Sequence, residues 1–217
     1  SGGNAITVGY VTNPGSGDDM LIRKYDRTGR LLWTQMYDGG GSGDEFSADV
    51  IIDAGDNIYA TGTGVNSSGN TDIVTLKYDP SGNLQWAAHY DGPLGGRDES
   101  YGWPAIGLDD NGNIYVGGYS QALDGVYEFA AVKYDSAGNE LWARRYRGPN
   151  TQRPNSYGYS IAVTGAGNVY MAGSVANLNN NSDYAVIKYD TDGNVLWERL
   201  FDGQHGGDDS LYTIAVD

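Results

Sequence analysis

Four oxygen-bearing side chains stand at comparable places along a chain of 217 residues, and together they suit a hard cation. Asp44, Asn155 and Asp208 each lie nine residues before the expected end of a strand, and Glu99 lies ten residues before one. Carboxylate and amide oxygens, with backbone carbonyls and water, are the ligands that calcium prefers, about six to eight at a time. We therefore predict that calcium or another cation binds in or above a central channel where these four side chains meet.

Aromatic side chains accompany these oxygens in the sequence. Aromatic rings beside carboxylates and amides suit the apolar faces of sugars, so we expect these rings to line the mouth of the channel and to bind ligand. Packing between neighbouring sheets is the alternative for most of them. The candidate ligand-binding residues are Tyr101, Trp103, Tyr157, Tyr159 and Tyr212.

The carboxylates also allow an enzymatic interpretation. Glycoside-cleaving enzymes act with two carboxylates in distinct roles, and Asp98 with Glu99 is a candidate pair. However, these two are adjacent in sequence, the chain has only 2 His, and it contains no nucleophile elbow or zinc motif. We therefore assign no catalytic residue and favour a binding function over an enzyme.

Charge and cysteine content narrow the possible partners. The chain has 28 acidic and 13 basic residues, a net charge of −15, and no cysteine. Such a field repels nucleic acid and anionic lipid and attracts cations, so we expect no nucleic-acid partner and no membrane insertion. Disulfides and thiolate metal sites are excluded, and we expect no organic cofactor.

The chain contains four copies of one sequence motif. "KYDRTGRLLWTQMYDG" at 24–39 returns with small changes, and its tryptophan recurs at intervals of 53, 56 and 55 residues. A second marker, the asparagine of "GNAI", "DNIY", "GNIY" and "GNVY", keeps the same intervals. The repeat units span about 1–46, 47–102, 103–157 and 158–210, within a single domain.

Within each unit the pattern is typical of strands. Short runs rich in Val, Ile, Thr and Tyr are separated by Gly, Asn and Asp, which predicts a four-stranded antiparallel meander. Units of this size repeated in series are typical of β-propeller blades. We therefore expect an all-β chain folded as a four-bladed β-propeller.

The two ends of the sequence predict how the ring closes. The first unit lacks its first strand, and "IAVD" at 214–217 matches the first strands of other units. We expect residues 211–217 to join the three N-terminal strands, because closure removes exposed sheet edges. The molecule is then a monomer; a homodimer that closes into eight blades is the alternative.

Residues present in every unit are explained first by the fold. We expect the tryptophans to pack between neighbouring blades, and the aspartates of "YD" to open tight turns in which glycine takes a positive φ. We expect two charged columns to pair with one another between strands. They are Asp19, Asp72, Glu128 and Asp183 on the acidic side, and Lys24, Lys77, Lys133 and Lys188 on the basic side.

The combination "GNIYVGGYS", "KYDSAGNELW" and "IAVD" resembles the bacterial β-propeller repeat family. The resemblance spans essentially the whole chain, and it implies propeller blades and a secreted or cell-surface location in a bacterium. It implies no catalytic residues. A weaker similarity, in Asp26, Gly29 and Trp33, is to the turns of quinone-dependent dehydrogenase propellers, where the tryptophan docks one blade against the next.

Function is expected where the units differ. Loops such as "NPGSGD", "VNSSGNT" and "QALDGVY" vary between units and gather on one face, which predicts a binding surface there. We expect a binding or scaffold module for carbohydrate or protein. The glycoside-active enzyme and a purely structural segment of a larger surface protein remain as alternatives.

Overall fold

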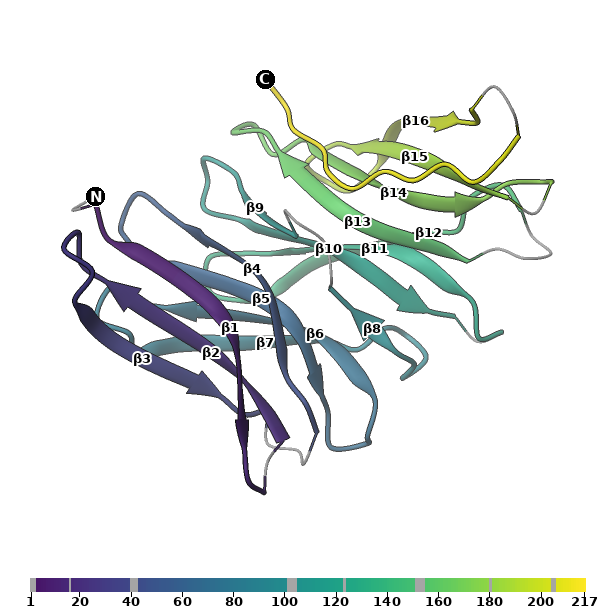
Figure 1. The fold of residues 1–217 in the computed structure, drawn as a ribbon. Helices are drawn as coiled ribbons and strands as arrows, with labels where there is room; N and C mark the ends of the chain where they lie inside the picture. The colour runs from purple at the N-terminus through teal and green to yellow at the C-terminus, as the bar shows by residue number, and fades with distance from the viewer. Residues whose placement is uncertain are drawn as a thin grey trace.

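The computed structural model describes residues 3–15, 17–39, 43–100, 105–122, 124–150, 155–179, 181–203 and 206–217. In these ranges the chain is all β, and its antiparallel strands form four sheets that follow one another along the chain (Figure 1). No helix able to cross a bilayer is found in these ranges.

Each sheet is a meander, as the repeat predicts. The first contains β1 (Ala5–Asn13), β2 (Gly17–Tyr25) and β3 (Leu31–Tyr37), and the second contains β4 (Phe46–Ile52), β5 (Ile58–Val65), β6 (Thr71–Tyr78) and β7 (Leu84–Tyr90). The third contains β8 (Asp98–Glu99), β9 (Ile106–Leu108), β10 (Ile114–Gln121), β11 (Tyr127–Tyr134) and β12 (Glu140–Tyr146). The fourth contains β13 (Ser156–Val163), β14 (Val169–Ala176), β15 (Ser182–Tyr189) and β16 (Val195–Phe201).

The first strand of the third sheet is divided. Both β8 and β9 pair with β10, and residues 101–104 between them, including Tyr101, Trp103 and Pro104, lie outside the described residues. The corresponding strands of the second and fourth sheets shift register between Ser47 and Asp49 and between Gly158 and Ser160. A bulge in the first strand therefore recurs in more than one unit.

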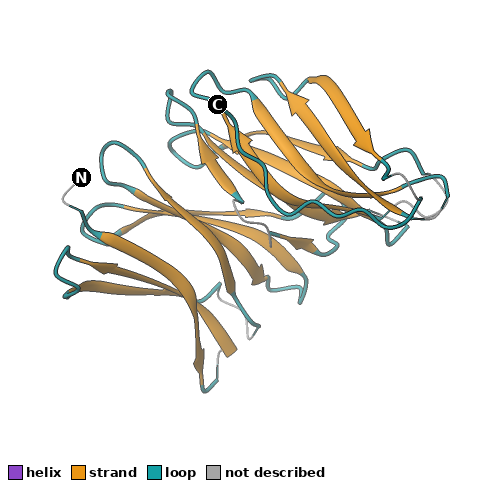
Figure 2. Cartoon of the chain, turned by 45° about the horizontal axis from the view of Figure 1, so that its top comes forward, coloured by secondary structure: helices purple, strands orange, loops and turns teal. Residues whose placement is uncertain are grey.

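The core lies between successive sheets, which stand side by side in Figure 2. Met20 and Ile22 of the first sheet pack against Ile58 and Leu76 of the second. Two further clusters join the second sheet to the third and the third to the fourth. Because the side chains of the second sheet alternate between these two interfaces, β5 and β6 are buried on both faces.

The predicted turns are confirmed. Asp79 accepts hydrogen bonds from the backbone N–H groups of Ser81 and Asn83, both at 2.9 Å, and Gly82 has a φ of 90°. The equivalent Gly29, Gly138 and Gly193 also have positive φ. "DTDGN" at 190–194 is a turn of the same kind, with Asp190 accepting from Asp192 N and Asn194 N.

The repeated tryptophan docks each sheet on the next. Trp142 Nε1 donates to the carbonyl of Thr191, in the β15–β16 turn of the following sheet, at 3.0 Å. Trp33 and Trp86 make the same bond to Pro80 and Ser136. The packing role predicted for these tryptophans is therefore confirmed between successive sheets.

The expected pairing of the two charged columns is wrong. Lys133 Nζ donates to the carbonyl of Thr191 at 2.9 Å, and Lys24 and Lys77 likewise reach carbonyls in the turn of the next sheet. Each of these lysines and the tryptophan of its sheet bind the same turn of the next sheet, so both side chains point toward that sheet. The residues of the acidic column have other partners, which are described below.

The two ends of the chain do not meet in this structure. The first sheet has three strands, as predicted, but residues 206–217 form no strand and run along the fourth sheet in both views (Figures 1 and 2). Ile214 N donates to Ser160 Oγ of β13 at 3.2 Å. The structure thus has four sheets in series, and closure into a four-bladed ring stays a prediction.

Candidate functional site

Four tyrosines gather where the third sheet meets the fourth. Tyr119 of β10 lies 5.3 Å from Tyr127 of β11 and 5.2 Å from Tyr157 of β13, between ring centroids. Tyr127 and Tyr157 are 5.5 Å apart, and Tyr159 stacks on Tyr157 at 6.4 Å with an interplanar angle of 14°. We call Tyr119, Tyr127, Tyr157 and Tyr159 the tyrosine cluster; all four are half-buried.

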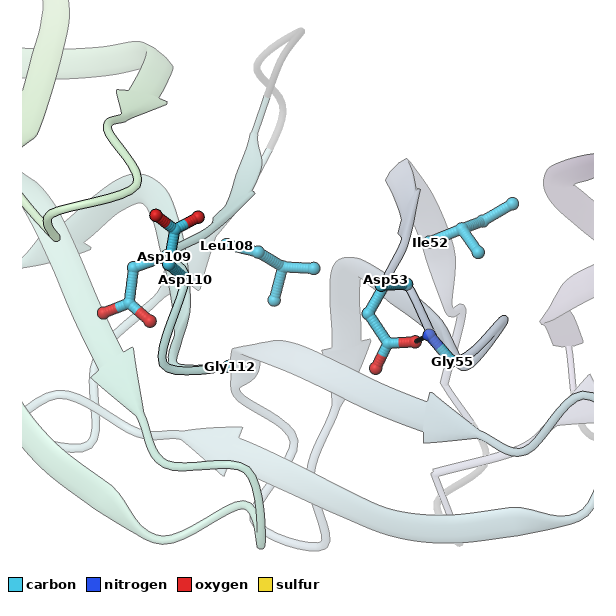
Figure 3. Close-up of a pocket in the computed structure, with 8 residues that line it drawn as sticks. Ile52, Asp53, Gly55, Leu108, Asp109, Asp110 and Gly112 are labelled. Atoms are coloured by element: carbon cyan, nitrogen blue, oxygen red, sulfur yellow. Dashed lines mark hydrogen bonds between the residues drawn. The ribbon is translucent and has the colours of Figure 1, made fainter. Parts of the chain in front are cut away.

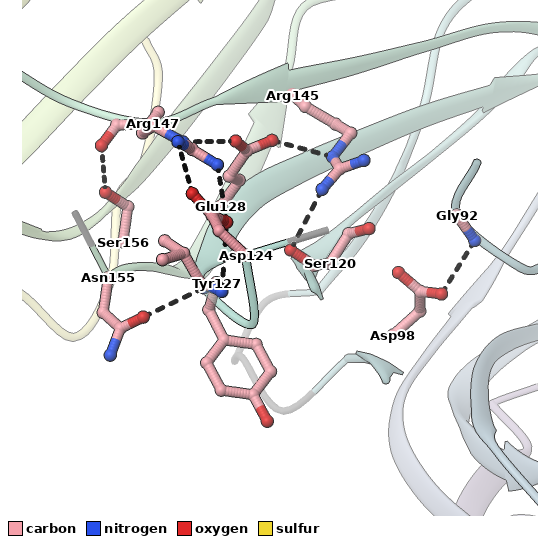
Figure 4. Close-up of polar contacts among 11 residues, drawn as sticks. Gly92, Asp98, Ser120, Asp124, Tyr127, Glu128, Arg145, Arg147, Asn155 and Ser156 are labelled. Atoms are coloured by element: carbon pink, nitrogen blue, oxygen red, sulfur yellow. Dashed lines mark hydrogen bonds and ion pairs between the residues drawn. The ribbon is translucent and has the colours of Figure 1, made fainter. Parts of the chain in front are cut away.

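Polar groups border the tyrosine cluster. The Tyr119 hydroxyl donates to Glu99 Oε2, and Arg97 Nη2 lies 2.7 Å from Glu99 Oε1. Asn155 Oδ1 accepts a hydrogen bond from Tyr127 N at 3.0 Å (Figure 4). Burial raises the pKa of Tyr157 and of Tyr159, so both hydroxyls remain protonated donors at neutral pH.

The structure brings some of the predicted ligand-binding residues together. Tyr157 and Tyr159 belong to the cluster, whereas Tyr212 lies in the C-terminal segment and is 80% exposed. Tyr101 and Trp103 lie outside the described residues, directly after Glu99 and Ser100 in the chain. The prediction for these two therefore stays untested.

Sequence reasoning missed Tyr119 and Tyr127. A signal was present, because Tyr127 replaces Asp18, Thr71 and Ser182 of the other units, so that the third unit alone carries an aromatic ring there. The contact itself depends on how β10 and β11 are placed against β13, which the repeat pattern does not specify.

The predicted metal ligands have hydrogen-bond partners near their own sheets. Asp44 Oδ1 accepts from Asp18 N at 3.0 Å, and Asp208 Oδ1 accepts from Ser182 N at 2.8 Å. Asn155 makes the same kind of contact to Tyr127, and Glu99 contacts Arg97 and Tyr119. Three of the four thus hold the start of β2, β11 or β15, and none belongs to the carboxylate groups that lie within ligand distance of one another.

Those carboxylate groups involve the neighbouring residues. In each of three units, carboxylate oxygens from three acidic side chains lie within 4.8 Å of one another. We call them the carboxylate triads. They are Asp19, Asp38 and Glu45 in the first unit, Asp72, Asp91 and Asp98 in the second, and Asp183, Asp202 and Asp209 in the fourth.

Each triad is built from the same three places of the fold. One acid lies in the strand next to the outermost strand of its sheet, which is β2, β6 or β15. The second acid follows the outermost strand, and the third lies in the segment that leads to the next unit. The third acid accepts a hydrogen bond from the backbone N–H of the glycine that follows the second acid. Asp98 Oδ2, for example, accepts from Gly92 N at 2.7 Å. Short turns thus fix the three carboxylates against one another.

Burial opposes ionisation in the triads. Glu45 and Asp98 are both 0% exposed. Burial, with a smaller contribution from the charges of Asp38 and Asp19, raises the pKa of Glu45 to about 7. Burial likewise raises the pKa of Asp98 to about 6 and raises the pKa of Asp183. Isolated carboxylates in such positions are costly to ionise unless a cation joins them.

The third unit replaces its triad with ion pairs. Glu128 takes the place of the first acid and Arg147 that of the second, with Arg147 Nε 2.6 Å from Glu128 Oε1 (Figure 4). Arg145 Nε lies 2.9 Å from Glu128 Oε2, and Arg147 also pairs with Asp124 at 3.0 Å. Ser156 stands at the third place, with its hydroxyl donating to the carbonyl of Arg147.

A pocket lies between the β4–β5 and β9–β10 turns (Figure 3). Two of its acidic groups are engaged within the turns: Asp53 Oδ1 accepts from Gly55 N at 2.8 Å, and Asp109 Oδ2 accepts from the Tyr115 hydroxyl at 2.9 Å. Burial acts to raise the pKa of both carboxyls, but their hydrogen bonds outweigh it, so the pKa of each is lowered. This pocket therefore reflects the turn structure and offers no free ligand group from these two residues.

Comparison with known proteins gives no identity. No family model matches the chain, and no curated protein sequence matches it.

Proposed function

We propose that this chain is a non-catalytic binding module that takes a carbohydrate ligand at the tyrosine cluster. The observation that supports it is the meeting of four half-buried tyrosines from three strands beside an arginine, a carboxylate and an amide. Tyrosine rings cover the apolar faces of sugars, while the bordering groups match sugar hydroxyls.

The directions of Asp98 and Glu99 favour binding over glycoside cleavage. These adjacent residues of β8 point to opposite faces, as strand geometry requires, with Asp98 contacting Gly92 N and Glu99 contacting Arg97 and Tyr119. A hydrolase needs two carboxylates that face one substrate, about 5 to 10 Å apart across the scissile bond. This pair does not supply that arrangement.

The setting we propose is a four-bladed propeller in a secreted or cell-surface bacterial protein. The four meanders, the docking of Trp33, Trp86 and Trp142 on the turn of the next sheet, and the three-stranded first sheet all support the ring. Closure by residues 211–217 would pair the free edge of β1, which is the physical reason to expect it.

The experiment is a glycan array followed by calorimetry on the best ligand. We expect saturable binding without hydrolysis products, and we expect Tyr127→Ala and Tyr157→Ala each to weaken it about tenfold, the loss of roughly 1.4 kcal/mol of stacking. Tyr10→Ala is the matched control, because Tyr10 holds in the first unit the place of Tyr119 and packs on Phe46 instead.

Three outcomes contradict the proposal. Sugar binding that survives both cluster substitutions moves the site elsewhere, and release of cleaved sugar supports the enzyme. An empty array, together with a protein partner whose binding is lost in Tyr157→Ala, changes the ligand class from carbohydrate to protein.

A further inference from the structure

We infer that the first, second and fourth units each bind one divalent cation of the calcium type at their carboxylate triads, and that Arg147 replaces this cation in the third unit. These sites are separate from the tyrosine cluster and do not depend on the proposed carbohydrate function. They also differ in residues and position from a shared ion on a central axis.

Negative charge is concentrated in each triad. Each triad holds three carboxylates with ligand oxygens within 4.8 Å, and in the first two triads two of the three residues are buried. In the second triad, His89 Nδ1 lies 3.8 Å from Asp72 Oδ2. Of the lysines expected to pair with these acids, Lys24 and Lys77 bind carbonyls of the next sheet instead.

One buried carboxylate oxygen of the first triad is unsatisfied. Glu45 is 0% exposed, and its Oε1 accepts a hydrogen bond from Val65 N at 3.2 Å. Its Oε2 is buried and has no hydrogen-bond partner among the described residues. A buried acceptor of this kind is costly to leave unpaired, and a cation coordinated with Asp19 and Asp38 would pair it.

The third unit differs from the others at all three triad places. At the three triad places the third unit has Glu128, Arg147 and Ser156, so a formal charge of −3 becomes zero. The asparagine that donates to the first acid, as Asn66 Nδ2 does to Asp72 Oδ1 at 2.8 Å, becomes Ala122. The positions change together, and the substituted side chain is itself a cation bound to the remaining carboxylate.

The ligand chemistry indicates the kind of ion. All triad ligands are carboxylate oxygens, which hard cations prefer over softer metals. Calcium binds oxygen at about 2.3 to 2.6 Å, so two ligands on opposite sides of it stand about 5 Å apart. The separations of up to 4.8 Å within each triad fit that geometry.

The location indicates what the ion does. In the first unit it joins β2, the end of β3 and the segment entering β4, and so links the first sheet to the second. In the fourth unit Asp209 belongs to the C-terminal segment, so the ion ties that segment to β15. In the third unit Arg147 pairs with Glu128, and the Arg147 carbonyl accepts from Ser156 Oγ of β13, so the equivalent link to the fourth sheet is made without a metal.

The test is calorimetric titration of the chelator-treated full chain with CaCl₂, with MgCl₂ as comparison. We expect three calcium ions per chain. Glu45→Gln, Asp98→Asn and Asp209→Asn should each lower this stoichiometry by one, while Glu128→Gln in the third unit should leave it at three.

A second variant covers the case in which these substitutions disturb folding. Asp38→Arg copies the third unit into the first, so it should lose one ion and yet raise the melting temperature of the calcium-free protein. A chain with no saturable calcium overturns the inference. So does a stoichiometry that Glu45→Gln, Asp98→Asn and Asp209→Asn leave unchanged, or one that falls in Glu128→Gln.

Discussion

At the residue scale, single buried carboxyls of the triads are costly to ionise. Glu45 sits in a fully buried place beside Asp19 and Asp38, and its one free oxygen has no donor among the described residues. Arg147 shows how the same fold removes that cost with a side chain. The contrast between these two residues separates a site that needs an ion from one that carries its own.

Glu45 makes the stability of the calcium-free protein depend on pH. Burial raises its pKa from 4.5 to about 7 in the folded protein, so the folded state binds more protons than the unfolded state between those values. The free energy of unfolding should therefore fall as pH rises from about 4.5 to 7. Urea unfolding in chelator across this range measures the slope.

Glu45→Gln should reduce that slope, and saturating calcium should flatten it in the unchanged chain. Asp98, whose pKa burial raises to about 6, adds to the same trend, so the stability of Glu45→Gln should still fall with rising pH, but less steeply. A calcium-free protein whose stability rises through this range would contradict the electrostatic picture of the triads.

At the scale of the elements, each sheet is anchored through the turn of the next. The indole of Trp142 is 8% exposed, packs between Tyr115 and Tyr189, and donates to the β15–β16 turn. Lys133 binds the same turn, and its ammonium group lies 5.0 Å from the Tyr115 ring centroid. One tryptophan and one lysine thus carry the contact that the repeat copies from unit to unit.

Trp142→Ala should lower the free energy of unfolding by about 3 to 5 kcal/mol, because it removes a buried ring and leaves a cavity between two sheets. Chemical denaturation followed by far-ultraviolet circular dichroism measures the loss. Leu141→Ala is the control, since Leu141 is 51% exposed on the other side of β12 and should cost little. Equal losses in the two variants would show that the tryptophan does not anchor the sheets.

The sequence predicts the strands, the turns and the tryptophan packing because each solves a local problem that recurs in every unit. The residues predicted as metal ligands lie next in sequence to residues of the triads, or to Ser156 at the equivalent place of the third unit, for a geometric reason. Neighbouring residues at a strand entry point to opposite sides, so Asp44 caps β2 while Glu45 enters the triad. Counting from the strand end gives the region but not the side.

The other difference lies in partners that come from distant strands. Asp38 and Asp91 each follow the outermost strand of a sheet. Only folding brings them close to the other two acids of their triads. The same holds for Tyr119 and Tyr127, which reach Tyr157 across two sheets. A comparison of the third unit with the others would have found the triad places and Tyr127, since the third unit differs there, but not Tyr119, whose place Tyr10 holds in the first unit.

At the scale of the whole molecule, the question is whether the four sheets close. In the structure, residues 206–217 lie along the fourth sheet, and β1 keeps a free edge. Val50 and Ala60 are partners on neighbouring strands of the second sheet, and the repeat places Ile214 and Thr7 at the same positions. A closed ring therefore puts Ile214 opposite Thr7.

A cysteine pair tests closure cleanly, because the chain has no cysteine of its own. With Thr7→Cys and Ile214→Cys, a closed ring should form a disulfide within one chain under mild oxidation, since cross-strand Cα atoms lie within disulfide range. Mass spectrometry after digestion identifies the link. Disulfides only between chains would indicate the eight-bladed dimer, and free thiols would indicate open ends.

The carboxylate triads connect all three scales, because the same three acids meet in every unit except the one that carries an arginine. The most direct measurement is anomalous diffraction from crystals grown with calcium or a lanthanide substitute. The account predicts three peaks, one at each triad, and none beside Arg147. Triads without a peak, or a single peak on a shared axis between the sheets, would contradict it.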